Sequence, residues 1–268
     1  MLLLYKLFLF SLLALLVPQA TQTSKQELND QLFEAVRKGD AAGVTAALDK
    51  GADVNAKFRY GQTALFKAAE RGNAEVAKIL LDRGVDVKVK DTFYQTTAMT
   101  WALDGKHIDV VKLILEKSAG DVDDVLLTGT QESNEELVKV ALDRGGVQPG
   151  TLTAALVVAQ DGKNAAISDL LTKAGAKPPL QVDAAILQSY AGKYKGDAGP
   201  EVTVTAQDGK LMVAGFTRQP QPVIALDNTT FRPAAFNGVT LTFNVEAGKV
   251  TGIALKQGSN TTQMKRIN

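Results

Sequence analysis

The 268-residue sequence contains no cysteine and only one histidine. Without cysteine the chain forms no disulfide and no thiolate metal site, and it has no N-terminal cysteine for lipid attachment. The single histidine, His107, has no second imidazole to complete a metal site or an acid–base pair with it. We therefore expect no bound metal and no cofactor.

The chain also lacks an excess of charge of either sign. Thirty Lys and Arg residues face 29 Asp and Glu residues, giving a net charge of +1. A chain so balanced creates no general field that would gather nucleic acid or an anionic bilayer. We expect no nucleic-acid partner.

Common catalytic motifs are missing as well. None of the seven serines begins an S-x-x-K motif or occupies a G-x-S-x-G motif. Five Gly-Lys pairs occur, but none is followed by Ser or Thr, so the sequence has no Walker A phosphate loop. We expect a protein that is not an enzyme and has no catalytic residues.

The first 20 residues have the layout of a signal peptide. Lys6 precedes an apolar run of about eleven residues, from Leu7 to Val17, and polar residues follow from Gln19. This run is shorter than the ~20 residues of a membrane-spanning helix, so we expect cleavage after Ala20 and no stable membrane span. The sequence predicts export to a periplasmic or extracellular location. The lack of cysteine fits a bacterial protein, while the glycosylation acceptor patterns at Asn228 and Asn260 leave eukaryotic secretion open.

Self-comparison reveals an internal repeat of about 33 residues. Five residues recur at that spacing in a second copy: Phe33, Ala35, Gly39, Leu48 and Gly51, followed by Phe66, Ala68, Gly72, Leu81 and Gly84. The second unit reads GQTALFKAAERGNAEVAKILLDRGVDV, and the third reads QTTAMTWALDGKHIDVVKLILEKSAGDV. Both units resemble the ankyrin repeat, which implies stacked pairs of helices.

Individual positions have expected roles in these helix pairs. Thr63 stands where the ankyrin threonine caps the first helix, and Gly72 separates the two helices. Lys106 or His107 is an insertion after Gly105, so the turn of the third unit should be one residue longer.

The pattern continues, less regularly, on both sides. A first unit covers residues 28–57, a degenerate fourth covers 121–148, and a fifth covers 149–176. Four to five units exceed the three or so that a stable stack requires. We therefore predict an all-α ankyrin-repeat solenoid over residues 24–176.

Residues 177–182, which include Pro178 and Pro179, predict a linker, because Val, Thr and Phe replace Ala and Leu beyond them. A small all-β antiparallel barrel or meander is expected over residues 183–268. It should contain a short helix at 184–189 and strands at 192–195, 201–206, 210–214, 223–226, 230–233, 240–245, 249–255 and 262–266.

The runs LQSYAGKYKGDAGPEVTVTAQDGKLMV and GVTLTFNVEAGKVTGIALKQG give this second domain its own resemblance. Over residues 186–267 it resembles a domain of unknown function often attached behind beta-lactamase-like serine hydrolases. The resemblance implies a lipocalin-like structure, an accessory role and no assigned catalytic residues. Tyr190, Tyr194, Phe231 and Phe243 either line a ligand cleft in the barrel or fill its core, and small barrels are usually packed solid.

Aromatic residues mark the predicted finger loops of the solenoid. Aromatic rings and arginine are enriched at interface hot spots, which makes these loops candidate partner-binding elements. The candidates are Phe58, Arg59, Tyr60, Phe93 and Tyr94, with a polar rim of Gln62, Glu70, Arg71, Thr96 and Asp104. The same rings could instead pack against one another or dock the β domain.

The sequence thus favours an exported, non-catalytic scaffold that binds an unidentified protein through its ankyrin fingers and concave face. One alternative is a carrier that holds a small hydrophobic ligand in the β barrel. Another is an accessory protein or inhibitor of a separate serine hydrolase.

Overall fold

The computed structural model describes residues 24–197, 201–215, 219–234, 238–257 and 260–267. The predicted signal peptide, residues 1–20, lies outside the described residues. The chain divides into two compact units, one ending at Ala98 and the other beginning at Met99. No helix in the described ranges is long and apolar enough to cross a membrane.

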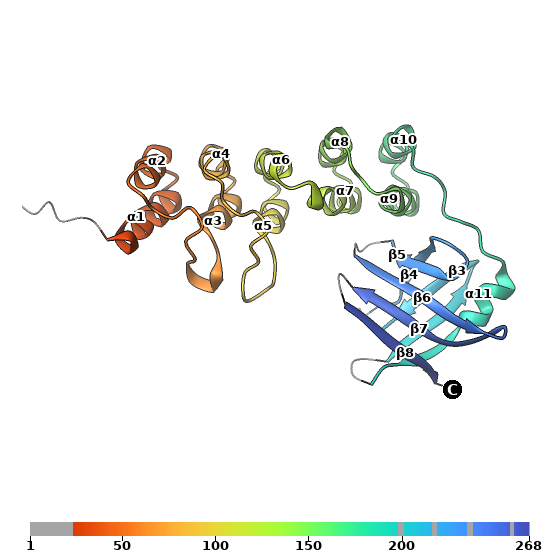
Figure 1. The fold of residues 1–268 in the computed structure, drawn as a ribbon. Helices are drawn as coiled ribbons and strands as arrows, with labels where there is room; N and C mark the ends of the chain where they lie inside the picture. Colours follow the sequence, from red (N-terminus) through yellow and green to blue (C-terminus); the bar gives the residue numbers. More distant parts are fainter. Residues whose placement is uncertain (1–23, 198–200, 216–218, 235–237, 258–259, 268) are drawn as a thin grey trace, which may run out of the picture. The chain divides into compact units, whose positions relative to one another are not determined.

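The first unit consists of paired helices and the loops that follow them (Figure 1). Ser24 begins the first pair with a capping box, in which its hydroxyl and the Glu27 carboxylate satisfy each other's main-chain N–H groups. Gly39 ends the first helix in the left-handed region, at φ 75°, which glycine adopts without steric cost. The helices are α1 (Lys25–Lys38), α2 (Ala41–Asp49), α3 (Ala64–Arg71) and α4 (Ala74–Asp82), with the 3-10 turn η1 (Arg59–Gly61) before α3.

Within this unit the helix pairs stack in two layers. Helix α1 packs against α3, and α2 packs against α4. Leu32, Leu65 and Leu80 are fully buried between them, so each pair covers the apolar face of its neighbour.

The second unit continues with three more helix pairs. Helix α6 packs against α8, α7 against α9, and α8 against α10. The predicted fourth and fifth units are therefore helix pairs. The elements are α5 (Ala98–Asp104), α6 (Ile108–Lys117), the turn η2 (Ala119–Asp121), α7 (Val122–Gln131), α8 (Glu135–Arg144), α9 (Pro149–Asp161) and α10 (Ala165–Lys173).

The turn of the third unit has the predicted extra residue. Three residues, from Gly105 to His107, separate α5 from α6, whereas Gly72 and Asn73 alone separate α3 from α4. Lys106 adopts the left-handed region at φ 56° to make this longer turn.

The prediction that the Thr63 side chain caps α3 is wrong. Its side chain makes no capping hydrogen bond to α3, and its buried hydroxyl has no hydrogen-bond partner among the described residues. The main-chain N–H of Phe66 donates instead to the carbonyl oxygen of Thr63, at 3.1 Å. The group that the hydroxyl would have capped is therefore already satisfied.

The C-terminal part of the second unit is a closed antiparallel barrel of eight strands, in the order β1 to β8, with β8 paired to β1. The barrel prediction is confirmed, and each expected strand appears within two residues of its predicted bounds. The elements are α11 (Ala184–Tyr190), β1 (Gly192–Lys195), β2 (Val202–Gln207), β3 (Lys210–Ala214), β4 (Gln221–Ala225), β5 (Thr230–Pro233), β6 (Val239–Glu246), β7 (Lys249–Gln257) and β8 (Asn260–Ile267).

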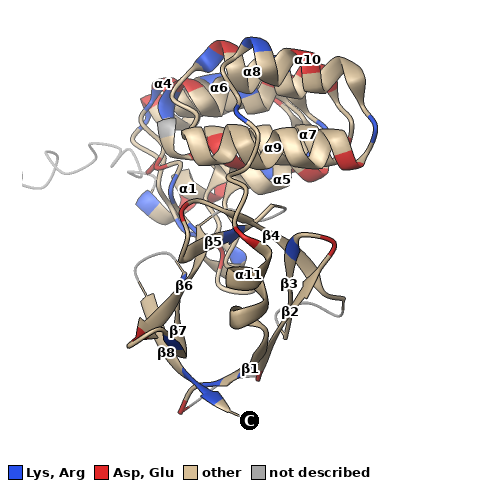
Figure 2. Cartoon of the chain, turned by 90° about the vertical axis from the view of Figure 1, so that its right-hand side faces the viewer, with Lys and Arg blue, Asp and Glu red and all other residues tan. Residues whose placement is uncertain are grey.

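Four aromatic side chains cluster in the barrel core. The ring of Tyr190, at the end of α11, stacks on Phe243 with centroids 4.0 Å apart, and Phe231 and Tyr194 meet Phe243 edge-on. Each tyrosine hydroxyl donates to a main-chain carbonyl, Tyr190 to Asn228 at 2.8 Å and Tyr194 to Tyr190 at 2.7 Å. Figure 2 shows α11 within the outline of the strands, which agrees with the place of Leu187 and Tyr190 in the barrel core.

We expect Phe243→Ala to destabilise the barrel by about 3–5 kcal/mol, because it removes the ring on which the other aromatic side chains converge. Phe93→Ala makes the same change at a ring that is 66% exposed, and should lower the free energy of unfolding by less than about 1 kcal/mol. Urea unfolding of the full chain, followed by circular dichroism, measures both. Equal losses would contradict this description of the barrel core.

Candidate functional site

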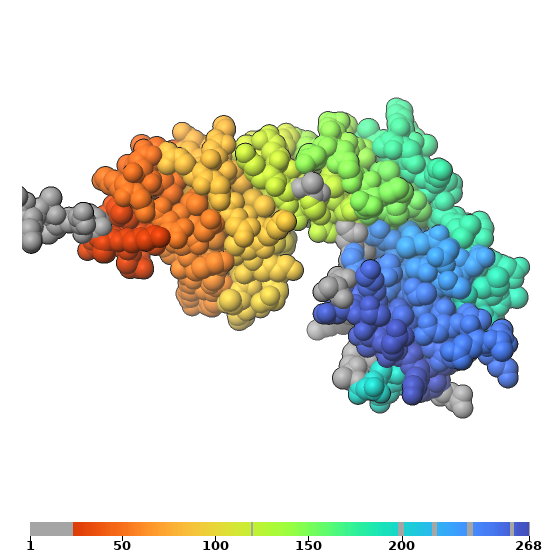
Figure 3. Space-filling model, in the orientation of Figure 1, coloured from red at the N-terminus to blue at the C-terminus, as the bar shows by residue number. Residues whose placement is uncertain are grey.

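Two finger loops extend from the first unit, one between α2 and α3 and the other between α4 and α5. Each tip is closed by main-chain hydrogen bonds, from Phe58 N to Gln62 O at 2.8 Å and from Asp91 N to Thr96 O at 2.9 Å. The N–H of Thr92 also donates to the carbonyl of Tyr60, at 2.8 Å, and so joins the second finger to the first. The tips project side by side (Figure 3) and form one surface.

The carboxylate of Asp91 organises the second finger. It is 1% exposed, and its Oδ1 accepts from the N–H groups of Phe93 at 2.9 Å and Tyr94 at 2.6 Å. Its Oδ2 accepts from the N–H of Thr96 at 3.1 Å and from the Thr96 hydroxyl at 2.6 Å. Burial raises the pKa of Asp91, but these hydrogen bonds outweigh it and lower the pKa from 3.8 to about 2.

The sequence pattern does not single out Asp91. One signal was available, because an Asp side chain commonly accepts from main-chain N–H groups two or three residues further on in a turn. That pattern occurs throughout turns, so it would not have distinguished Asp91 from Asp53 or Asp86, which accept from Asn55 and Lys88 in the same way.

Three aromatic rings cluster at the tips. Tyr60 lies 5.8 Å from Phe93, and Phe93 meets Tyr94 edge-on at 4.6 Å, measured between ring centroids. The guanidinium carbon of Arg59 lies 4.6 Å from the centroid of the Tyr60 ring. We call Arg59, Tyr60, Phe93 and Tyr94 the aromatic fingertip patch.

The rings of this patch contact one another and still face solvent. Tyr60 is 44% exposed, Phe93 66% and Tyr94 67%. Tyr60 also adopts a positive φ of 59°, which a bulky residue rarely takes, so its ring is held at the tip at some cost in backbone strain. Exposed aromatic rings on a fixed backbone are suited to binding another molecule.

Phe58, predicted as part of the same surface, has a different role. Its ring stacks on Phe33 of α1 with centroids 4.2 Å apart, and the residue is partly buried. Phe58 therefore anchors the first finger to the helix pair.

The predicted rim residues lie in several places. Gln62 closes the first tip through its main-chain carbonyl, and Thr96 donates its hydroxyl to Asp91. Glu70 forms an ion pair with Lys67, whereas Arg71 is exposed in the last turn of α3. Asp104 is exposed at the end of α5 and belongs to the second unit. Of the ten predicted residues, four form the patch.

No metal centre is found among the residues that the structure describes, since no group of three His, Cys, Asp or Glu residues converges there. His107 is a half-buried residue at the N-cap of α6.

The second unit contains a cleft of about 330 Å³ that reaches residues of the barrel core. Residues 178–182, the end of α9, Leu187 of α11, the turn between β2 and β3, and strands β4 and β5 line it. Of the four aromatic residues predicted either to line a cleft or to fill the core, Phe231 does both. The ion pair of Lys210 Nζ and Asp161 Oδ1, at 3.5 Å, connects two of these elements. Nearby, the buried Arg232 donates to the Thr151 hydroxyl at 3.1 Å, which links β5 to α9. The small-ligand alternative stays a prediction, with this cleft as its candidate site.

Comparison with known families agrees with the two-part architecture. A model described as ankyrin repeats matches residues 32–125 in three copies. A model described as a domain of unknown function, DUF3471, matches residues 176–267. Comparison with curated proteins gives no significant match. Both resemblances seen in the sequence are confirmed, and the structure adds the helix pairs beyond residue 125.

We expect Asp91→Ala to destabilise the first unit by about 1–3 kcal/mol, because it leaves several main-chain N–H groups without their partner. Asp86→Ala, which removes a single hydrogen bond in the same loop, should change stability by less than about 0.5 kcal/mol. Urea unfolding of both variants measures the difference.

The stabilisation by Asp91 should also depend on pH. Its pKa is lower in the folded chain than the unperturbed 3.8, so its contribution is complete above about pH 4 and is lost as the pH falls toward 2. If Asp91→Ala lost as much stability as the wild type over this range, the assigned role of the carboxylate would be wrong.

Proposed function

Because the chain contains ankyrin repeats and a DUF3471 domain, we propose that it is an exported, non-catalytic scaffold that binds a protein partner through the aromatic fingertip patch. Ankyrin repeats point in general to protein–protein interaction. The observation that carries the specific proposal is the exposure of three mutually contacting rings on two hydrogen-bonded finger tips.

The residue types and the fixed backbone of the fingers both favour binding at this surface. Aromatic side chains bury a large area at a small cost in conformational entropy, and tyrosine and arginine are enriched among residues whose loss weakens complexes most. The hydrogen bonds of Asp91 and Thr92 fix the loops before binding, so less entropy is lost when a partner docks.

The binding proposal is tested with Tyr60→Ala/Phe93→Ala/Tyr94→Ala in the full chain. Crosslinking in the native envelope, followed by affinity capture and mass spectrometry, should recover a defined partner with the wild type. Recovery should fall at least about tenfold with the triple variant. Phe58 is left intact, because its removal would disturb the finger itself.

The matched control is Leu226→Ala/Val245→Ala, which removes two exposed aliphatic side chains, 43% and 45% exposed, from the β domain. This control should recover the partner as the wild type does. Unchanged recovery by the triple variant, with an unchanged melting temperature, would refute the proposal. If the captured partner is a serine hydrolase, the accessory role implied by the DUF3471 resemblance gains direct support.

Export is proposed from the leader-like residues 1–20. Mass spectrometry of the protein from the envelope fraction should find an N-terminus at or near Thr21. Leu12→Arg/Leu15→Arg interrupts the apolar run and should keep the chain in the cytoplasm, whereas Leu12→Val/Leu15→Val should be exported. A chain that retains Met1 in the cytoplasm would contradict export.

A further inference from the structure

The two fingers that carry the aromatic patch also carry exposed positive charge. Lys57 and Arg59 lie in the first finger, and Lys88 and Lys90 lie in the second. Within the ranges that the structure describes, none of these four side chains takes part in an ion pair. Their charges are therefore available to a partner.

The acidic residues of the same loops offset this charge only in part. Asp91 is buried and hydrogen-bonded within its own finger. Asp53 pairs with Lys25 at 3.5 Å, and Asp86 accepts from the N–H of Lys88. The exposed charge of the fingers is consequently positive, although the whole chain is nearly neutral.

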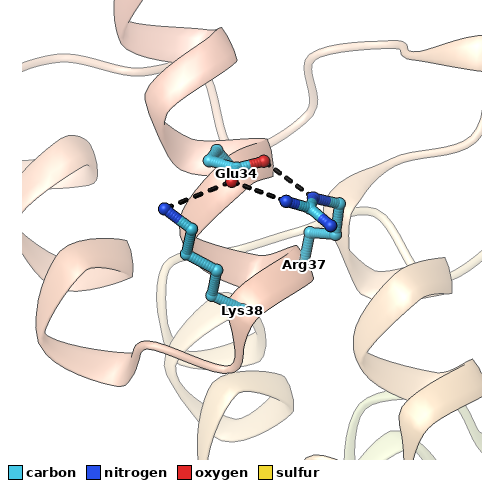
Figure 4. A network of polar contacts seen from close by, with 3 residues as sticks. All are labelled: Glu34, Arg37 and Lys38. Atoms are coloured by element: carbon cyan, nitrogen blue, oxygen red, sulfur yellow. Dashed lines mark hydrogen bonds and ion pairs between the residues drawn. The ribbon is translucent and has the colours of Figure 1, made fainter.

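Cations on α1 in the same unit form ion pairs instead. Glu34 accepts from Arg37 at 2.7 Å and forms an ion pair with Lys38 at 3.2 Å (Figure 4). The hydrogen bonds from Arg37 and then Lys38 lower the pKa of Glu34 to about 2, so this carboxylate stays ionised. The four finger cations, which have no ion pair among the described residues, differ in this from Arg37 and Lys38.

We propose, on the basis of the proposed function, that the partner presents an acidic segment with an apolar or aromatic side chain. The three rings of the patch take the apolar side chain, and the four finger cations attract the carboxylates around it. Arg59 belongs to both parts of the surface, because its guanidinium lies over Tyr60 and its N–H groups can pair with a carboxylate. Complementary charge of this kind speeds association and excludes basic partners.

Single-stranded nucleic acid also binds aromatic rings and cations, but this surface is less suited to it. Successive bases stack on ring faces. Here Phe93 meets Tyr94 at an interplanar angle of 85° and Tyr60 at 48°, so the three faces do not form a stacking platform. A folded or extended acidic protein segment requires no such alignment.

The test is selection of a displayed random peptide library against the full chain. Enriched peptides should be acidic and contain aromatic or aliphatic residues. Their affinity should fall at least about tenfold for Lys57→Gln/Arg59→Gln/Lys88→Gln/Lys90→Gln, and should fall when salt rises from 50 to 300 mM. The matched control, Lys177→Gln/Lys249→Gln/Lys256→Gln/Lys265→Gln, removes four exposed lysines elsewhere and should bind as the wild type does.

The outcomes separate this inference from the function on which it rests. Enrichment of neutral or basic peptides that the triple aromatic variant fails to bind would overturn the acidic partner but keep the patch. Acidic peptides that bind the triple variant normally would overturn the patch as the binding surface. No enrichment, or tighter binding of a 15-residue oligothymidylate than of any selected peptide, would overturn the acidic-segment proposal.

Discussion

The hydrogen bonds to the Asp91 carboxylate determine how the second finger presents its aromatic side chains. Three N–H groups and one hydroxyl converge on this buried group, so the main chain from Phe93 to Thr96 has a single arrangement. The bond from Thr92 to Tyr60 then extends that order to the first finger. The conformational entropy of both loops is therefore lost during folding and not during binding. Exposed rings on such loops bind a partner more tightly for this reason.

Different interactions fix the main chain of the two fingers. Position 57, which corresponds to position 91 at a spacing of 34 residues, is lysine, so the first finger has no equivalent carboxylate. Its anchor is the stacking of Phe58 on Phe33. Lys57 instead adds an exposed cation to the finger that carries Arg59 and Tyr60. The change from Asp91 to Lys57 between the two copies thus alters both how the finger is anchored and what charge it carries.

Much of this architecture is predicted from the sequence. The 33-residue spacing reveals the repeat, and its resemblance to the ankyrin repeat implies the helix pairs. Alternating residues with short turns predict the eight strands. The interactions that shape the site are harder to predict. These interactions depend on distances of a few ångströms between segments, which a one-dimensional pattern does not contain. Examples are the missing cap of Thr63, the packing of Phe58 on Phe33, and the hydrogen bonds of the Asp91 carboxylate.

Chemical nitration of tyrosine, read by mass spectrometry, determines whether the two fingertips contact the partner. Tyr60 and Tyr94 are exposed, whereas Tyr190 and Tyr194 are 3% and 0% exposed in the barrel core. If the fingertips are the binding surface, the first two react in the free protein, the partner protects both in the complex, and the barrel pair stays unreactive throughout. If Tyr60 and Tyr94 reacted equally in the free protein and in the complex, the fingertips would not be the binding surface.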